Sequence, residues 1–261
     1  MTQRPLGAQI SHMLKARGVD TIFGIPGVHN VEMYRGIEEA GITHVLARHE
    51  QGAGFMADGY ARATGKPGVA YVITGPGLCN TMTPLGQAYS DSVPVLAISS
   101  CLDETSAKRG QLHQMLDQEA AAATVCEWSY EARSASAAYQ LIDRAFTEFA
   151  SARPRPKHIQ VPIALAGEMA KGAAAALPKS AKPQVSQALL YEAVAMILRA
   201  EKPIFVFGGG AVAGADVVGD LLRMTGAASF TTYAGRGIVP SEALLHFGST
   251  LARADTADVF A

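Results

Sequence analysis

The chain has 261 residues, of which 22 are Lys or Arg and 23 are Asp or Glu, so its formal net charge is −1. Hydrophobic residues make up 49% of the sequence and charged residues 17%, a balance that predicts a large buried core and excludes global disorder. A charge this close to zero gives no electrostatic reason to expect a nucleic-acid partner. The longest mainly apolar run, residues 203–215, is rich in Gly and shorter than the ~20 residues that cross a bilayer, so we expect no membrane partner.

Targeting signals and cysteine usage point to one compartment. The first 20 residues carry no apolar block that ends in a small-residue cleavage site, so no secretion signal is expected. The three cysteines are widely spaced and odd in number, which fits reduced thiols better than a disulfide framework. We therefore expect a soluble cytoplasmic protein.

Helical and strand patterns alternate along the first part of the chain. In chain order, the expected elements are a helix at 6–17, a strand at 21–23, a helix at 30–40 capped by Asn30, a strand at 42–47, a helix at 50–63, a strand at 69–74, a helix at 78–89, a strand at 93–99, a helix at 134–150 and a strand at 157–162. Continuous apolar strands between helices are typical of a parallel sheet covered on both faces. The predicted fold is α/β, a doubly wound parallel sheet with helices on both faces. No element is expected between Cys101 and Ala123, where the sequence is polar and without a clear period.

The composition changes after Pro162. The sequence becomes Ala-rich and carries Pro178 and Pro183, so we place an interdomain linker at residues 171–187, after a first domain at 1–170. Residues 188–261 are expected to form a second, incomplete α/β domain, because two strands and two helices bury a doubly wound sheet poorly. Its expected elements are a helix at 186–200, a strand at 203–207, a helix at 213–225 and a strand at 228–232.

Two glycine-rich turns follow predicted strands of the first domain. Ligands of open α/β sheets bind at such strand ends, so Pro26 and Gly27 are candidates, although a tight turn alone explains their residue types. The second turn, Gly75-Pro76-Gly77, opens a helix whose backbone N–H groups suit an anion. It lacks the Lys-Ser/Thr of a P-loop, which makes phosphate binding a weak expectation.

Polar side chains stand out at two further places. Glu50 begins a predicted helix, where the helix dipole favours a carboxylate by ~0.3–1 kcal/mol, so a purely structural first-turn acid stays open. Gln111 to Gln114 could face a cavity or belong to an ordinary solvated loop. Phe207 to Gly210 is an incomplete dinucleotide turn, which leaves a flavin- or nicotinamide-binding protein as one alternative.

Taken together, these segments resemble one family in order and spacing. The chain resembles the N-terminal half of thiamine-diphosphate-dependent enzymes of the acetolactate synthase and 2-oxo acid decarboxylase group. The likeness covers nearly all of residues 1–170, and residues 186–261 are similar to the start of the family's middle domain. The segments that carry it are FGIPGVHN (23–30), ARHEQGAGFMADGYARATGKPGV (47–69), TGPGLCNTMTPLGQAYSDSVPVLAIS (74–99) and RPRPKHIQVPI (153–163).

The resemblance implies roles for individual residues. Glu50 would be the catalytic carboxylate that faces N1′ of the cofactor's aminopyrimidine ring and exchanges a proton there. The other residues implied at the cofactor are Pro26, Gly27, Gly75, Pro76, Gly77 and Asn80. Those implied on the side of a 2-oxo acid substrate are Val28, His29, His113 and Gln114.

Two departures from the family pattern are informative. Val28 stands where some relatives have Asp or Ser, so it has no polar catalytic role. His113-Gln114-Met115 replaces the Phe-Gln-Glu of acetolactate synthases, which favours decarboxylation of another 2-oxo acid over acetolactate formation. Similar relatives include decarboxylases of guanidino 2-oxo acids.

The family's diphosphate and Mg²⁺ site is a GDG sequence followed by Asn-Asn in a C-terminal domain, and this sequence contains no GDG. We therefore expect no metal site here and a chain that is catalytically incomplete alone. The resemblance also implies a homodimer or homotetramer, and flavin in the middle domain is possible but not expected. A non-catalytic module that retains the fold for assembly or regulation remains the alternative.

Overall fold

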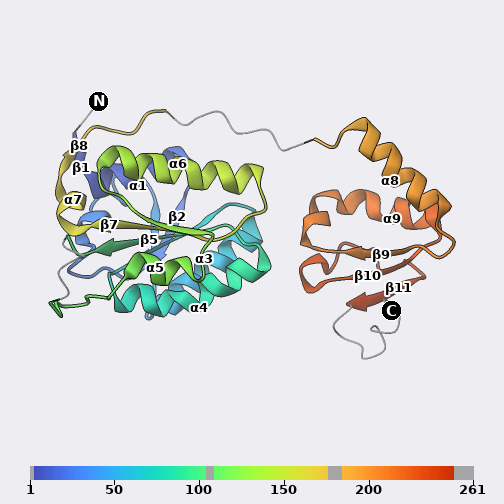
Figure 1. Cartoon of the computed structure of the whole chain (residues 1–261), viewed down its shortest axis with the longest axis horizontal. Helices are drawn as coiled ribbons and strands as arrows, with labels where there is room; N and C mark the ends of the chain where they lie inside the picture. Colours follow the sequence, from blue (N-terminus) through green and yellow to red (C-terminus); the bar gives the residue numbers. More distant parts are fainter. Residues whose placement is uncertain (1–2, 104–108, 176–183, 250–261) are drawn as a thin grey trace. The chain divides into compact units, whose positions relative to one another are not determined.

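The computed structural model describes residues 3–103, 109–175 and 184–249. Contacts divide the chain into two compact units, Met1–Pro183 and Gln184–Ala261, each with its own main sheet (Figure 1). The predicted linker at 171–187 lies partly outside the described residues, and the first helix of the second unit begins at its last residue.

A parallel sheet of six strands forms the centre of the first unit. Its strands are β2 (Thr21–Gly24), β3 (Thr43–Leu46), β4 (Gly68–Val72), β5 (Val95–Cys101), β6 (Trp128–Glu131) and β7 (Lys157–Pro162). They lie in the order β3-β2-β4-β5-β7-β6, and every neighbouring pair is parallel. From β2 the chain moves to β3 on one side and then to β4 on the other. The carboxyl ends of β2 and β4 therefore form a topological switch point, where open α/β sheets bind ligands.

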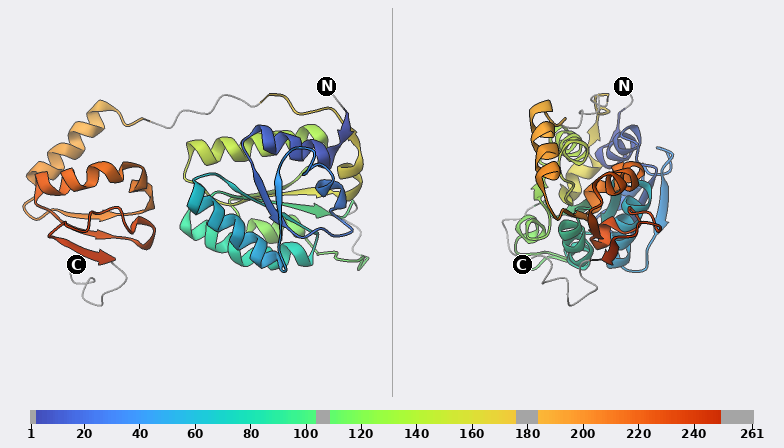
Figure 2. Two further views of the ribbon diagram at one scale, coloured as in Figure 1. Left: turned by 180° about the vertical axis from the view of Figure 1, so that it is seen from behind. Right: turned by 90° about the vertical axis from the view of Figure 1, so that its right-hand side faces the viewer.

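Helices cover both faces of this sheet. They are α1 (Leu6–Ala16), α2 (Val31–Tyr34), α3 (Glu50–Thr64), α4 (Pro76–Asp91), α5 (Gln118–Ala123), α6 (Ala135–Ser151) and α7 (Ile163–Gly167). Figures 1 and 2 show α1 and α6 on one face and α3 and α4 on the other. Two separate apolar clusters fill these layers, one around Leu14 and Ile142 and one around Ala57 and Leu85. The doubly wound α/β fold is thus confirmed.

Three details of the first unit differ from the sequence-based expectation. The helix expected at 30–40 is α-helical only from Val31 to Tyr34, because i→i+3 bonds such as Ile37 N–H to Tyr34 O (3.2 Å) replace the α-helical pattern. The polar stretch after Cys101 contains α5, and β6 follows it. A short antiparallel pair, β1 (Arg4–Pro5) with β8 (Met169–Ala170), was also not expected.

The second unit has a parallel sheet of three strands in the order β11-β10-β9. Its elements are α8 (Gln187–Arg199), β9 (Ile204–Phe207), the 3₁₀ helix η1 (Gly209–Gly214), α9 (Ala215–Thr225), β10 (Ala228–Thr231), η2 (Tyr233–Gly235) and β11 (His246–Ser249). The two expected helices and two expected strands are confirmed, and β11 is an addition. The glycines of the candidate dinucleotide turn lead into η1. None of the described helices combines the length and apolar character that crossing a membrane requires.

Candidate active site

Glu50 and Asn80 meet at the carboxyl edge of the sheet, near the switch point. Glu50 is the first residue of α3, and the side chain of His49 caps this helix by accepting a bond from Gln51 N–H over 3.1 Å. Asn80, in the first part of α4, donates from Nδ2 to Oε2 of Glu50 over 2.9 Å. The structure thus brings together two residues that are 30 positions apart and holds a half-buried carboxylate at a helix N-terminus, where the dipole favours negative charge.

The turn at Gly75-Pro76-Gly77 leads from β4 into α4. Gly75 has φ of 64°, and a Cβ there would overlap the carbonyl oxygen of His113, so the position requires glycine for both conformation and space. Pro76 opens α4 at a position where its missing N–H is no loss. The Cys79 N–H donates to Gly75 O over 2.9 Å, which ties the turn to the helix.

The loop after β2 carries Pro26 to Asn30. The Asn30 side chain does not cap α2 as predicted; instead its Oδ1 accepts from Gly27 N–H at 2.7 Å and its Nδ2 donates to Ile25 O at 3.2 Å. Local bonds from the side chain to the preceding backbone thus replace helix capping at Asn30. The loop leaves the Val28 side chain 69% exposed.

His29 and His113 lie against each other, with ring centroids 5.3 Å apart and planes at 73°. The Nδ1 atoms of both rings are buried and have no hydrogen-bond partner within the described parts of the chain. Burial lowers the pKa of His29, and the charge of His113 lowers it further, so His29 is neutral near pH 7. His113 itself holds φ of 63°, which is rare outside glycine. Two predicted substrate-side residues are therefore side by side with unused polar atoms.

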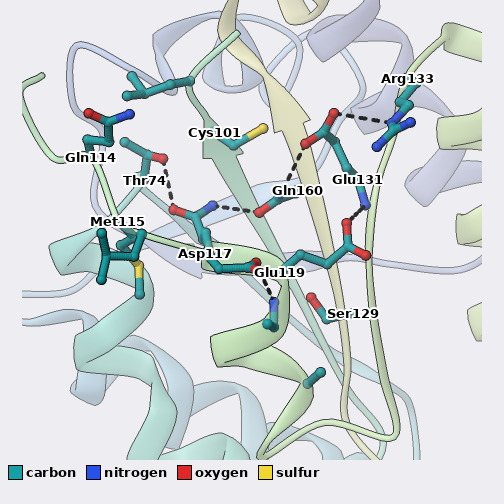
Figure 3. A pocket seen from close by; sticks show the side chains of 15 residues that line it. Thr74, Cys101, Gln114, Met115, Asp117, Glu119, Ser129, Glu131, Arg133 and Gln160 are labelled. Carbon is teal, nitrogen blue, oxygen red and sulfur yellow. Dashed lines mark hydrogen bonds and ion pairs between the residues drawn. The ribbon is translucent and has the colours of Figure 1, made fainter. Parts of the chain in front are cut away.

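Gln114 follows this pair and lines a pocket of about 400 Å³ at the carboxyl ends of β5, β6 and β7 (Figure 3). Figure 3 shows Gln160 between Thr74 and Glu131, and the Gln160 amide donates to Glu131 Oε2 over 3.0 Å. The pocket wall also includes the buried thiol of Cys101, whose pKa is raised by burial and by nearby carboxylates, Glu131 first.

A buried polar network in the wall of this pocket was not predicted from the sequence. Its centre is Gln118, the first residue of α5, which hydrogen-bonds to residues at the ends of β4, β5 and β7. His158 is buried nearby between two hydroxyls, with Ser99 Oγ 2.8 Å from Nε2 and Ser129 Oγ 2.7 Å from Nδ1. Polar residues inside apolar strands, such as Ser99-Ser100 and His158, were the signal that could have revealed it.

Within the described residues, no group of three or more His, Cys, Asp or Glu side chains is arranged to hold a metal ion. Residues 4–121 match the family model for the thiamine pyrophosphate enzyme, N-terminal TPP binding domain. The chain belongs to the thiamine pyrophosphate enzymes. Glu50, Asn80 and the Gly75-Pro76-Gly77 turn all lie inside the matched region.

Several relatives within this family are similar over most of the chain. A Pseudomonas aeruginosa protein named "Probable 2-ketoarginine decarboxylase" is 46% identical over 250 residues, which cover 94% of this chain and 44% of the relative. The large subunit of acetolactate synthase isozyme 1 of Escherichia coli K12 is 31% identical over 250 residues, with the same two coverages. Glyoxylate carboligase of Escherichia coli O157:H7 is 32% identical over 242 residues, covering 88% of this chain and 40% of the relative. The chain thus spans less than half the length of these thiamine pyrophosphate enzymes.

Proposed function

We propose that this chain supplies the pyrimidine-binding part of the active site of a thiamine-diphosphate-dependent enzyme that acts on 2-oxo acids. In this proposal, residues 1–170 are the pyrimidine-binding domain and residues 188–261 belong to the middle domain. The observation that carries it is the 2.9 Å bond from Asn80 to Glu50 beside the Gly75-Pro76-Gly77 turn. A carboxylate fixed in this way is the group that proton exchange with a ring nitrogen requires.

The chemistry of this donor set fits the aminopyrimidine end of the cofactor. Asn80 occupies Oε2 of Glu50, while Oε1 has no hydrogen-bond partner in the described ranges and is free to face a protonated nitrogen. The glycine turn beside it presents backbone without side-chain bulk at Gly75 and Gly77, and Gly27 does the same next to Pro26 in the loop after β2. These are the surroundings that a flat, polar ring needs.

When bound, thiamine diphosphate would supply an electron sink for loss of CO₂ from a 2-oxo acid. Glu50 would hold and exchange a proton at N1′ of the pyrimidine ring, and Asn80 would keep its carboxylate in place. On the substrate side, the buried Nδ1 atoms of His29 and His113 would bind the polar end of the 2-oxo acid, with Gln114 and Val28 beside them. The residues that bind the Mg²⁺ of the diphosphate would belong to a part of the active site outside this chain. Flavin has no role in the proposal.

The substrate class is proposed from the relatives and from one local feature. Identity to the protein named as a 2-ketoarginine decarboxylase is 46%, against 31% to acetolactate synthase over the same length. His113-Gln114-Met115 also departs from the acetolactate synthase pattern, and His113 is built into the site through its contact with Gly75. We therefore favour a lyase that decarboxylates a guanidino 2-oxo acid over a carboligating transferase.

A second subunit is part of the proposal. Phe55 and Met56 on α3, one turn and a half beyond Glu50, are 37% and 41% exposed. An apolar helix surface beside a catalytic group is typical of a site completed by another chain. A homodimer or homotetramer would bury these side chains.

The protein produced from the complete gene, incubated with thiamine diphosphate and Mg²⁺, tests this function. We expect CO₂ release from 2-ketoarginine with a kcat/KM at least about tenfold above that for pyruvate, a difference of about 1.4 kcal/mol. Equal use of pyruvate with acetolactate as the product would contradict the substrate class. Absence of CO₂ release from any 2-oxo acid tested would favour the non-catalytic module.

A further inference from the structure

Gln118 contacts the glycine turn directly. Its side chain is 7% exposed, and its Oε1 accepts two hydrogen bonds from the residues that open the turn. One comes from Thr74 Oγ1 over 2.9 Å and the other from Gly75 N–H over 2.8 Å. Gln118 is 44 residues from Thr74 and 43 from Gly75 in the sequence. These bonds therefore form a long-range brace between α5 and the end of β4.

The other end of the same carboxamide is anchored in the sheet. The two N–H bonds of Gln118 Nε2 are shared among three acceptors, Ser100 O at 2.8 Å, Gln160 Oε1 at 3.0 Å and Ser99 Oγ at 3.1 Å. These partners lie on β5 and β7. One buried side chain thus joins the carboxyl ends of three strands, and every polar atom of its amide is in use.

We propose that Gln118 is a positioning residue that fixes the Gly75-Pro76-Gly77 turn and, through the first turn of α4, places Asn80 against Glu50. The inference rests on the proposed function, because the turn and Glu50 are the parts of the site assigned to the cofactor. The link is short: Gly75 caps α4, Cys79 N–H bonds to Gly75 O, and Asn80 is the next residue.

Only glutamine provides this combination. Glutamate at position 118 keeps an acceptor for Thr74 and Gly75 but cannot donate to Ser100 O or Gln160 Oε1 when ionised. Methionine has a similar length and neither function. Gln118→Glu therefore removes only the bonds that Nε2 donates, whereas Gln118→Met removes the bonds at both ends of the carboxamide. Gln140→Met is a matched control, because Gln140 is an exposed α6 residue whose side chain, among the described residues, bonds only to Ser136 of its own helix.

Amide hydrogen exchange on the full chain, without cofactor, tests the brace. We expect exchange at Gly75 to accelerate by about tenfold in Gln118→Met, which matches the loss of one net hydrogen bond, and by less in Gln118→Glu. Exchange in Gln140→Met should match the wild type. If Gln118→Met fails to fold, Gln118→Glu decides. Relative to the wild type, exchange in Gln118→Glu should be faster at residues next to Ser100 and Gln160 and unchanged on α1. Unchanged exchange at Gly75 in a folded Gln118→Met protein would overturn the inference.

Cofactor binding to the complete protein gives the second measurement. Gln118→Met should raise the KM for thiamine diphosphate by about tenfold and leave the KM for the 2-oxo acid near the wild-type value. Faster exchange at Gly75 with an unchanged cofactor KM would overturn the link from the turn to the cofactor. A wild-type protein that binds no thiamine diphosphate would contradict the proposed function, while the exchange result would still decide whether Gln118 holds the turn.

Discussion

Asn80, in the second turn of α4, donates a hydrogen bond to Glu50 at the start of α3, with 2.9 Å between Nδ2 and Oε2. Each residue lies near a helix N-terminus, and each helix follows a strand beside the switch point of the sheet. The Glu50 carboxylate is therefore held between α3 and α4, and the positions of these helices depend on β3, β2 and β4, which are neighbours in the sheet. Substitutions at this contact test the proposed chemistry most directly.

Glu50→Gln keeps the shape of the side chain and removes its ability to exchange a proton. We expect decarboxylation by the complete protein to fall by more than about tenfold, which corresponds to over about 1.4 kcal/mol in the barrier. Glu38→Gln, on an exposed turn, is the control and should retain full activity. A Glu50→Gln enzyme within tenfold of the wild type would remove Glu50 from the proposed role.

Asn80→Ala leaves the carboxylate in place and removes its donor. The expected loss of activity is smaller, about fivefold, because one hydrogen bond to a charged group contributes about 1 kcal/mol or somewhat more. Gln87→Ala on the exposed side of α4 serves as the matched variant. Steady-state kinetics of the three proteins decides, and an Asn80→Ala protein with wild-type kcat and cofactor KM would show that the contact has no functional weight.

Gly75→Ala should destabilise the first unit. The new Cβ meets the His113 carbonyl oxygen and the backbone must keep φ of 64°, so we expect a loss of about 3 kcal/mol or more in the free energy of unfolding. Gly41→Ala has a similar φ of 69° with nothing within 4 Å of the new Cβ, and it should cost only about 1 kcal/mol. Urea unfolding followed by Trp128 fluorescence measures both, because the chain has 1 Trp and it lies in the first unit. Equal losses would show that the His113 contact carries no energy.

His158 makes the stability of the first unit depend on pH. Burial lowers its pKa from 6.5 to about 3, so the unfolded chain binds a proton that the folded chain does not. The contribution of this residue is fully present above pH 6.5 and is lost as the pH falls toward about 3. Between pH 7 and pH 5 the loss should be about 2 kcal/mol.

The measurement is urea unfolding at both pH values for the wild type and for His158→Gln. The variant cannot take up the proton. Its free energy of unfolding should therefore fall by about 2 kcal/mol less than that of the wild type between pH 7 and pH 5. An identical pH dependence in the two proteins would assign the effect to other groups.

The three thiols should differ sharply in reactivity. Cys79 is exposed in the first turn of α4, whereas Cys101 and Cys126 are buried, and burial raises the pKa of Cys126 to about 12. A thiol reagent at pH 8 should therefore label one cysteine in the native chain and all three after denaturation. Rapid labelling of three thiols without denaturant would contradict the packing of β5 and of the turn after α5.

Strands β2, β3, β4 and β5 were predictable because they are largely apolar runs between helical patterns, and β7 begins and ends at the expected residues, 157 and 162, whereas β1, β6 and β8 were missed. The Glu50 and Gly75 features were predictable because residue type and local position define them. Gln118 was not, because its meaning comes from partners on three strands that are separated from it by 18 to 44 residues. The end of α2 was missed for a local reason, since Gly41 suggested a helix terminus and the i→i+3 turns before it have no distinct sequence pattern.

The pairing of β1 with β8 has a consequence for how the chain is made. Arg4 pairs with Ala170, Leu6 N–H donates to Glu168 O over 2.8 Å, and the buried Gln9 amide donates to Ala170 O over 3.0 Å. Because a ribosome releases the N-terminus first, Leu6 and Gln9 cannot form these hydrogen bonds until Glu168 and Ala170 have been synthesised and released. A nascent chain arrested before Glu168 should remain open to protease at its N-terminal end, and one arrested well beyond Ala170 should be closed.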